Sequence, residues 1–228
     1  MAHQHHFARQ PITDRDGRLL GFELLYRADC DAVGAGVVDG VFATRSVLEA
    51  LDRHGLEMFD GVPVFVNLPR ELVLDTSLLS FDPRRVAFEI LEDVHADVAV
   101  LDAVGTLREA GFTVALDDFT ADPKRLALVE HADIVKLEVH QSSRRDQRSL
   151  LRDLHARGVL VLAEKVETTT QVETCRRLGF DLFQGYAVGR PVTVALPVTP
   201  EETRAVAQIS GRRSHLVPLR VTAEPVTP

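Results

Sequence analysis

The chain has 228 residues, a hydrophobic content of 45% and no tryptophan, so valine, leucine and alanine must build its core. This length fits one large α/β domain better than two ordinary domains. The formal net charge of -8 excludes a general DNA- or RNA-binding protein, because no domain-wide positive field is available to release counterions.

The first elements along the chain are two strands, predicted over 5–12 and 18–26. They are joined by a segment that contains Asp16-Gly17, a strong signal for a tight turn between antiparallel strands. The apolar residues over 41–55 recur at helical spacing, which predicts a helix after this pair of strands.

A regular alternation of strand and helix follows. Buried strands are predicted over 63–67, 85–90, 112–117, 133–137, 159–163 and 180–184. The helices between them are predicted over 69–79, 96–110, 123–131, 143–157 and 168–178. Asp122 is expected to cap the third of these helices and Pro123 to take its first position. Gly111, Gly158 and Gly179 are expected to end helices.

Short connections between alternating strands and helices imply parallel pairing and right-handed crossovers. The six strands and the N-terminal pair make eight. The predicted fold is therefore α/β, a modified TIM-like (β/α)8 barrel with one antiparallel strand, and an open doubly wound sheet is the alternative. After Pro191 the alternation fails, which predicts a domain over 1–195 and a C-terminal extension over 196–228, with a helix at 201–209 and then a loose tail.

Cysteine usage and apolar runs indicate a cytoplasmic protein. Cys30 and Cys175 lie far apart without a CxxC spacing, which predicts reduced thiols. No apolar run approaches the roughly 18 residues that a membrane span requires. The start of the chain also lacks the apolar stretch of a signal peptide.

Polar residues recur at the point where the predicted strands end. They are Asn67, Glu89, Asp117 with Asp118, Lys136, Glu164 and Gln184. In a parallel barrel the C-terminal ends of all strands meet at one mouth, where barrel enzymes keep their active sites. One such residue is more often a helix cap or a solvated charge, but the series points to a common site.

The chemistry of this series points to hard divalent cations. Carboxylates suit Mg²⁺ or Mn²⁺ rather than Zn²⁺, and histidine is absent from these strand ends. Glu89, Asp117, Asp118 and Glu164 cannot all stay ionised in one pocket without cations, and two divalent ions would balance them. Two metals close together are typical of phosphate-ester hydrolysis. Lys136 can orient the attacking water or neutralise phosphate charge.

Seven short motifs resemble the EAL-domain phosphodiesterases. GFELLYR at 21–27 is similar to the GxEALxR signature, and FVN, FEILE, ALDDF, DIVKLE, LAEKVE and FQGY follow in the order of that family. The resemblance covers roughly residues 6–192. The details GFELLYR and AEKVET resemble the EAL half of EAL–HDOD signalling proteins, although the residues after 192 are too few for an HDOD domain.

The resemblance implies a modified TIM barrel that hydrolyses cyclic di-GMP to linear pGpG with Mg²⁺ or Mn²⁺ in bacterial second-messenger signalling. It adds Glu23 as a catalytic metal ligand, and assigns Glu164 as a ligand or as the general base. Arg27 would contact a phosphate, and Leu25, Asn67 and Gln184 would also bind the dinucleotide. The metal ligands it implies are Glu23, Asn67, Glu89, Asp117, Asp118, Glu164 and Gln184. Glu92 would anchor the loop after Asp118, and Glu167 would support the ligands without touching the metals.

The sequence departs from the family pattern at three places, and the third of them bears on whether the barrel is catalytic. Leu24 replaces the alanine of the signature and enlarges a side chain that we expect beside the ligand, Glu138 replaces an aspartate, and DDFTADPKR at 117–125 replaces DDFGTGYSS. The complete ligand set favours a cyclic di-GMP phosphodiesterase. The altered loop favours a non-catalytic barrel that binds cyclic di-GMP or a protein partner and acts as a switch. The resemblance also leaves a homodimer open, because this loop couples to dimerisation in the family. A third reading, proton abstraction by Lys136 in another Mg²⁺ barrel, lacks a domain to enclose a substrate.

Overall fold

The strands close into a ring. The computed structural model describes residues 4–27, 39–54, 56, 59, 61–141 and 143–197, and in them the sheet order is β2-β3-β4-β5-β6-β7-β8-β1-β9, with β1 also bonded to β2. The strands are β1 (Gln4–Asp14), β2 (Leu19–Arg27), β3 (Val64–Leu68), β4 (Val86–Ile90), β5 (Thr113–Leu116), β6 (Ile134–Glu138), β7 (Leu160–Glu164), β8 (Leu182–Phe183) and β9 (Val192–Pro197). Because the ring closes, the open-sheet alternative is excluded and the predicted barrel is confirmed.

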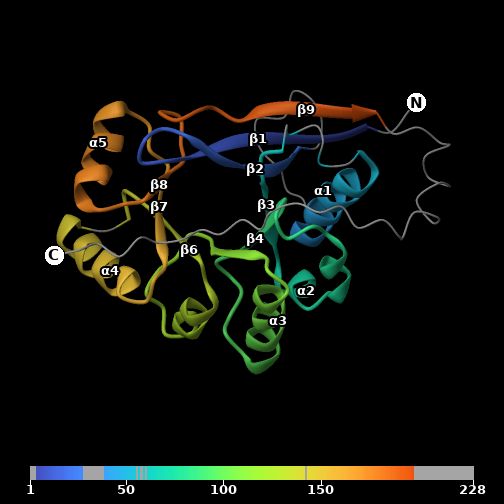
Figure 1. Ribbon diagram of the computed structural model, residues 1–228, viewed down its shortest axis with the longest axis horizontal. Helices are drawn as coiled ribbons and strands as arrows, with labels where there is room; N and C mark the ends of the chain where they lie inside the picture. The colour runs from blue at the N-terminus through green and yellow to red at the C-terminus, as the bar shows by residue number, and fades with distance from the viewer. Residues whose placement is uncertain are drawn as a thin grey trace.

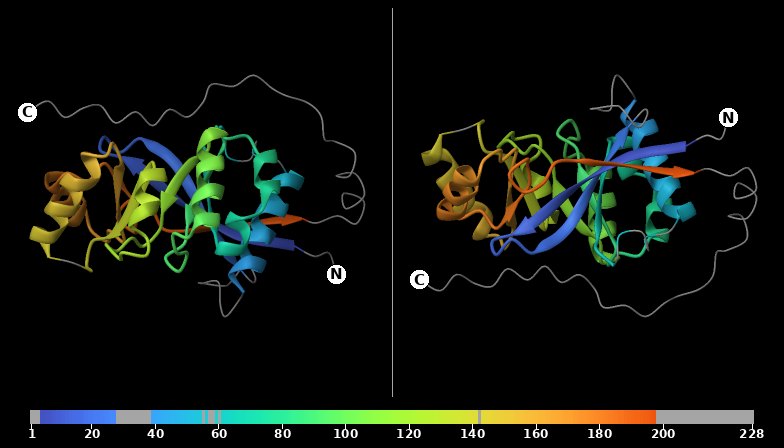
Figure 2. Two further views of the ribbon diagram at one scale, coloured as in Figure 1. Left: turned by 90° about the horizontal axis from the view of Figure 1, so that it is seen from below. Right: turned by 90° about the horizontal axis from the view of Figure 1, so that it is seen from above.

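The strand β1 is the antiparallel member of the barrel. It runs antiparallel to β2 on one side and to β8 on the other, whereas β2 to β8 are parallel to one another. The turn between β1 and β2 is fixed by the Asp14 side chain, which accepts hydrogen bonds from the amides of Asp16 and Arg18 at 2.8 Å each. The predicted antiparallel pair is therefore present (Figures 1 and 2).

Helices lie on the outer side of the barrel along its parallel strands, whereas β1 and β9 cross a side that these helices leave open (Figures 1 and 2). They are α1 (Gly40–His54), α2 (Arg70–Val73), α3 (Val98–Glu109), α4 (Arg144–His155) and α5 (Thr169–Leu178), with the 3-10 helices η2 (Thr76–Ser80) and η3 (Leu126–His131). The Asp97 side chain caps α3, and Thr168 and Gln171 form a reciprocal capping box on α5. None of the described helices has the length and apolarity needed to span a membrane.

Two of the predicted helices are not single α-helices in the structure. The helix expected over 69–79 divides into α2 and η2, because the Asp75 side chain accepts the Ser77 amide and starts a new turn. The helix expected over 123–131 is the 3-10 helix η3, which begins after Arg125 rather than at Asp122 and Pro123. A 3-10 helix rises about 2.0 Å per residue and so covers the remaining distance to β6 with fewer residues than an α-helix.

The strand β9 was not predicted from the sequence. It pairs antiparallel with the first half of β1, and both cross one side of the molecule as long ribbons (Figure 1). The alternation of strands and helices does not predict this pairing between β1 and β9, which joins the first and last strands of the domain. It also carries the barrel sheet to Pro197, past the boundary expected at residue 195. The helix expected over 201–209, the tail after it and Cys30 lie outside the described residues, whereas Cys175 is buried with a free thiol.

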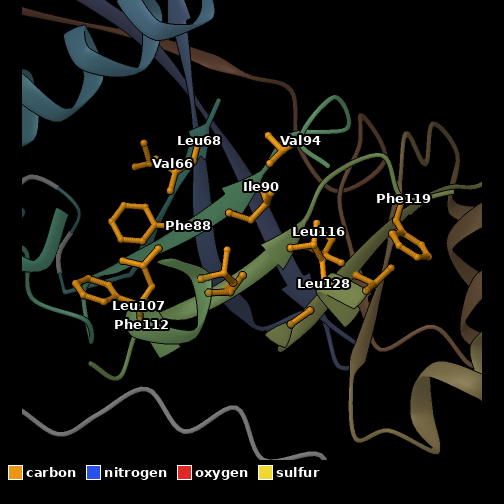
Figure 3. Close-up of a cluster of buried hydrophobic side chains, with 14 of the residues drawn as sticks. Val66, Leu68, Phe88, Ile90, Val94, Leu107, Phe112, Leu116, Phe119 and Leu128 are labelled. Carbon is orange, nitrogen blue, oxygen red and sulfur yellow. The ribbon is translucent and has the colours of Figure 1, made fainter. Parts of the chain in front are cut away.

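The core has two parts. A large apolar cluster fills the space between the sheet and the helices, and Figure 3 shows its members from β3, β4 and the elements beside them. A second cluster, here called the barrel floor, fills the inside of the ring with Ile12, Phe65, Ala87, Ala115, Ile134, Leu162 and Leu182. Gly21 of β2 leaves room for this filling, because an added Cβ there would lie 2.6 Å from the Phe65 ring.

Candidate active site at the barrel mouth

The inward-facing residues above the barrel floor are polar. Alternate residues of a strand face the same side, so a residue two positions beyond a floor residue also points into the ring. These positions, here called the barrel mouth, hold Glu23, Asn67, Glu89, Asp117, Lys136, Glu164 and Gln184, and Gln10 of the antiparallel β1 joins them. The structure thus brings the strand-end residues predicted from the sequence to one place.

Lys136 lies at the centre of the barrel mouth and contacts four carboxylates. Its Nζ is 2.7 Å from Glu89 Oε2, 2.7 Å from Asp117 Oδ1, 3.0 Å from Glu164 Oε1 and 3.5 Å from Glu23 Oε2. The Lys136 side chain is 1% exposed and the Glu89 side chain is fully buried. Charges this deeply buried are retained only when opposite charges or cations compensate them.

The environment of the mouth shifts the pKa values of three of these groups. Burial would lower the pKa of Lys136, but the surrounding carboxylates outweigh burial and raise it well above its ordinary value. Burial, and then the charge of Glu23, raises the pKa of Glu89 well above the usual range in spite of Lys136. Burial raises the pKa of Glu164 to about 7, against the attraction of Lys136. Lys136 is therefore a fixed cation, whereas Glu164 can exchange a proton near neutral pH.

Two amide side chains orient Glu23. Asn67 Nδ2 donates to Glu23 Oε1 at 3.0 Å, and Gln184 Nε2 donates to Glu23 Oε2 at 2.5 Å. The amide nitrogens are used in these contacts, so both amide oxygens stay available for another group. Gly185 fixes the backbone beside Gln184, because an added Cβ would lie 2.3 Å from the Val166 carbonyl oxygen.

Five buried oxygen atoms of this region have no hydrogen-bond partner in the described part of the chain. They are Asn67 Oδ1, Glu89 Oε1, Asp118 Oδ1, Glu164 Oε2 and Gln184 Oε1. Buried acceptors without donors are costly and need an explanation. A divalent cation with oxygen ligands satisfies such atoms, so the residues present fit Mg²⁺ or Mn²⁺.

The carboxylates of the mouth are not arranged around an empty centre. Among the described residues, no three acidic, histidine or cysteine side chains stand in a ready-made metal-binding geometry. The Lys136 ammonium group takes the central position instead. Glu89 and Glu164 each offer one carboxylate oxygen to Lys136 and keep the other oxygen without a partner.

A second lysine, Lys165, lies beside Asp118 at the rim of the mouth. Lys165 Nζ lies 2.6 Å from Glu138 Oε2 and 3.5 Å from Asp118 Oδ2. Asp118 and Lys165 both have positive φ angles, 38° and 57°, a conformation that residues other than glycine seldom adopt. The turns after β5 and β7 are thus held in a strained arrangement that faces their side chains toward one another.

A cavity of about 440 Å³ opens at the mouth. Its lining includes Leu25, Asp118, Glu164, Glu167 and Tyr186. A larger hollow of about 730 Å³ lies beside α4, but arginines line it and no carboxylate does. The mouth cavity is therefore the place where the acidic groups can meet a ligand.

Arg27, the residue expected to contact a phosphate, does not line the mouth cavity. Arg27 is 7% exposed and lines a smaller cavity together with Leu25 and Asn67. Burial lowers the pKa of Arg27, and Glu23 and Tyr186 partly offset this effect.

Glu92 is exposed and its charge favours the charged form of Arg125, which donates to the backbone carbonyls of Ile90 and Leu91, so the expectation that Glu92 anchors the loop after Asp118 stays a prediction. The Leu24 side chain packs in the cluster between sheet and helices, on the other face of β2 from Glu23. Leu24 also lines the smaller cavity that holds Arg27 and Asn67, so the expectation that its larger side chain lies beside the ligand stays a prediction.

Three residues near the mouth were missed by sequence reasoning. Gln10 accepts a hydrogen bond from Gln184 at 3.4 Å, but β1 runs antiparallel, so this residue does not stand at a strand end. Lys165 follows Glu164 directly, and its place in the motif does not predict that its side chain contacts Glu138 and Asp118. Arg125 is buried, which nothing in an exposed-looking run such as DPKR indicates.

Comparisons with known proteins agree with this geometry. A sequence model of the family described as EAL domain matches residues 2–191. The uncharacterized protein YuxH of Bacillus subtilis (strain 168) is 34% identical over 190 residues, which is 81% of this chain and 46% of YuxH. The cyclic di-GMP phosphodiesterase CdgJ of Vibrio cholerae serotype O1 is 28% identical over 207 residues, 87% of this chain and 47% of CdgJ. The chain spans about half the length of these curated relatives.

Solved structures share the fold. An EAL domain protein from Listeria monocytogenes EGD-e superposes with a TM-score of 0.66 at 24% identity, over 82% of this chain and 88% of that protein. The Bacillus subtilis YkuI protein, which has an EAL domain and was solved with substrate c-di-GMP and calcium, gives a TM-score of 0.65 at 21% identity, over 87% of this chain and 58% of YkuI. At these identities the likeness carries the fold alone.

Proposed function

The chain belongs to the EAL domain family, and from this membership we propose that its barrel mouth hydrolyses cyclic di-GMP to linear pGpG. The observation that carries the proposal is the set of buried, unpartnered oxygen atoms on Asn67, Glu89, Asp118, Glu164 and Gln184. A binding surface for protein alone has no need of such atoms. CdgJ, a relative over most of this chain, is named a cyclic di-GMP phosphodiesterase, which supports the same substrate.

Two Mg²⁺ or Mn²⁺ ions fit the donor set. Their ligands would be Glu23, Asn67, Glu89, Asp117, Asp118, Glu164 and Gln184. When bound, such ions lower the pKa of a water molecule and offset the charge of a phosphate group. Calcium with c-di-GMP on the structural neighbour YkuI supports a divalent ion in this kind of mouth.

The side chains of the chain have distinct tasks in this proposal. Arg27, which is buried and has no carboxylate in ion-pair contact among the described residues, binds a phosphate of the dinucleotide. Leu25 lies on the cavity wall and offers an apolar surface to the ligand. Asn67 and Gln184 hold Glu23 through their amide nitrogens, so their oxygens face the ions or the ligand.

Lys136 and Glu164 have different roles in the reaction because their protonation states at neutral pH differ. Hydrolysis forms a bond between a water oxygen and phosphorus, and breaks the bond from phosphorus to the 3′ oxygen, which leaves with a proton. Glu164, with a pKa of about 7, can accept a proton from the water at neutral pH. Lys136 stays protonated and stabilises negative charge on the phosphate or orients the water.

The direct test is incubation of the purified protein with cyclic di-GMP and Mn²⁺ or Mg²⁺, followed by chromatography for pGpG. We expect metal-dependent product and loss of nearly all of it in Glu89→Gln, a substitution of equal size at a fully buried position. Turnover that survives Glu89→Gln would mean that the site is elsewhere or that the product comes from a contaminant.

A second candidate function is a signalling switch that binds cyclic di-GMP without hydrolysis. The central position of Lys136 favours it, because the ammonium group already neutralises part of the acidic cluster. A protein partner or a second copy of the chain would then read the bound state. Cyclic di-GMP binding by calorimetry with no pGpG after prolonged incubation with metal would select this function over hydrolysis.

A further inference from the structure

Arg125 is an arginine buried inside the turn that follows β5. It is 2% exposed, and its guanidinium group donates three hydrogen bonds to backbone carbonyls. Nη1 donates to Asp117 O at 2.9 Å, and Nη2 donates to Ile90 O at 3.1 Å and to Leu91 O at 3.0 Å. One side chain thus joins the backbone at the end of β5 to the backbone at the end of β4.

The two strand ends that Arg125 joins carry neighbouring acids of the mouth. Glu89 precedes Ile90 directly, and Asp117 is itself a contact of Arg125. Both carboxylates lie 2.7 Å from Lys136 Nζ, so they share one cation in this structure. The separation of the two strand ends determines whether these carboxylates can share a cation.

The turn beyond Asp117 needs support. Asp118 has a φ of 38°, and such backbone strain persists only where surrounding contacts fix it. On one side of the turn Arg125 binds the Asp117 carbonyl, and on the other the Phe119 amide donates to Lys136 O at 2.9 Å. The Phe119 ring belongs to the apolar cluster (Figure 3). The Arg125 guanidinium lies over this ring, 5.8 Å from its centre.

Stability alone is a poor reason for this arginine. Among the described residues no carboxylate lies within ion-pair distance of it, and its Nε has no partner. Burial lowers the pKa of Arg125, and the charges of Asp117, Glu92, Asp93 and Asp118 offset this effect only in part. The buried guanidinium is therefore costly, and an apolar side chain would fill the same space at lower cost. What an apolar side chain cannot do is bind three carbonyl groups of two strands at once.

We infer that Arg125 is a positioning residue, which clamps the ends of β4 and β5 so that Glu89, Asp117 and Asp118 stand where a shared cation can reach them. In the sequence DDFTADPKR, the buried guanidinium supplies the order that the Gly-Thr-Gly turn supplies in the resembled loop. The altered loop is thus a replacement support for the ligands. This inference rests on the proposed metal site, and deepens it.

The test compares Arg125→Met with a matched control, Arg85→Met. Arg85 also donates to a backbone carbonyl, that of Leu56, and also has an unpartnered Nε, but it stands just before β4, at the opposite end of the barrel. Both substitutions remove a guanidinium group that binds backbone. Only the first touches the mouth, so general loss of stability affects both and loss of positioning affects one.

Two measurements are made on full-length proteins at a temperature where circular dichroism shows each to be folded. Mn²⁺ affinity is measured by titration with electron paramagnetic resonance, and we expect Arg125→Met to bind about 10- to 100-fold more weakly than wild type. Backbone amide exchange is measured by NMR, and we expect the amides of Asp117 and Phe119 to exchange about tenfold faster or more. Arg85→Met should leave both within about twofold of wild type.

If Arg125→Met does not fold, Arg125→Lys tests whether Arg125 positions the ends of β4 and β5. A lysine keeps the charge but cannot bridge three carbonyls, so we expect weaker Mn²⁺ binding and faster exchange than in wild type, short of the full loss. Wild-type values in either folded Arg125 variant, or equal losses in Arg85→Met, would overturn the inference. If wild type binds no Mn²⁺, the proposed metal site fails, and the exchange of the Asp117 and Phe119 amides still decides whether Arg125 is a clamp.

Discussion

The barrel floor and the barrel mouth lie two residues apart on the same strands, and most residues of both are buried. On β7, Leu162 of the floor is fully buried and Glu164 of the mouth is 8% exposed. The floor consists of apolar side chains that fill the ring, whereas the mouth holds charges that compensate one another around Lys136 and still leave oxygens without partners. Burial by itself therefore does not distinguish the structural residues of the floor from the candidate functional residues of the mouth. The buried oxygen atoms without hydrogen-bond partners do distinguish them.

The largest expected effect on this comparison comes from Lys136→Met. In metal-free protein it leaves Glu89 and its neighbours without a counter-charge, and we expect a loss of about 3–5 kcal/mol in the free energy of unfolding at pH 7. Mn²⁺ should restore part of this loss and bind more tightly than to wild type, because the ammonium group no longer competes. Urea unfolding with chelator and with Mn²⁺ measures both effects; equal stability of the variant and wild type without metal would contradict the account.

Leu162→Ala gives the corresponding change in the floor. It removes a fully buried side chain from the inside of the ring, and we expect a loss of about 3 kcal/mol from transfer and cavity terms. Mn²⁺ should raise the stability of this variant by the same amount as that of wild type. A metal-dependent rescue of Leu162→Ala, measured in the same urea experiment, would show that floor and mouth do not act separately.

The pH dependence of stability should arise in the mouth. Burial raises the pKa of Glu164 from 4.5 to about 7 against the attraction of Lys136. A carboxyl with a raised pKa stabilises the folded state below its ordinary pKa, and this contribution is lost as the pH rises through about 7. Metal-free wild type should therefore lose more stability between pH 4.5 and 7 than Glu164→Gln does.

Thermal unfolding across that pH range compares the two proteins. Mn²⁺ affinity should change in the opposite sense and rise through pH 7, because the metal displaces the proton of Glu164. Leu162→Ala is the control from the floor and should follow the wild-type pH dependence. A parallel pH dependence in wild type and Glu164→Gln would assign the titration to another group.

The smallest expected effect comes from Lys165→Gly at the rim. Glycine adopts the φ of 57° without strain, which offsets the loss of the half-exposed contacts to Glu138 and Asp118, so stability should change by less than about 1 kcal/mol. Without the ammonium group beside Asp118, Mn²⁺ should bind a few-fold more tightly at low salt. Unchanged Mn²⁺ affinity in a titration would mean that Asp118 is not a ligand.

Much of the site could be predicted from the sequence, because short apolar runs predict buried strands and the polar residues after them mark where those strands end. Asn67, Glu89, Asp117, Lys136, Glu164 and Gln184 are all found at the mouth as predicted. Gln10 was missed because its strand runs the other way, so its position in the chain precedes the floor residue instead of following it. The strand β9 was missed because its partner lies at the far end of the chain, and no local pattern encodes a pairing between the first and last strands.

The sequence by itself determined the barrel and the place of its mouth, because alternation along strands is a local property. Only the tertiary structure decided how the charges of the mouth are balanced. It placed the Lys136 ammonium group among four carboxylates, packed Leu24 into the cluster between sheet and helices, and buried Arg125 inside the turn after β5. These outcomes depend on distances between strands that are far apart in the chain, and on burial, which changes the energy of a charge without changing the residue that carries it.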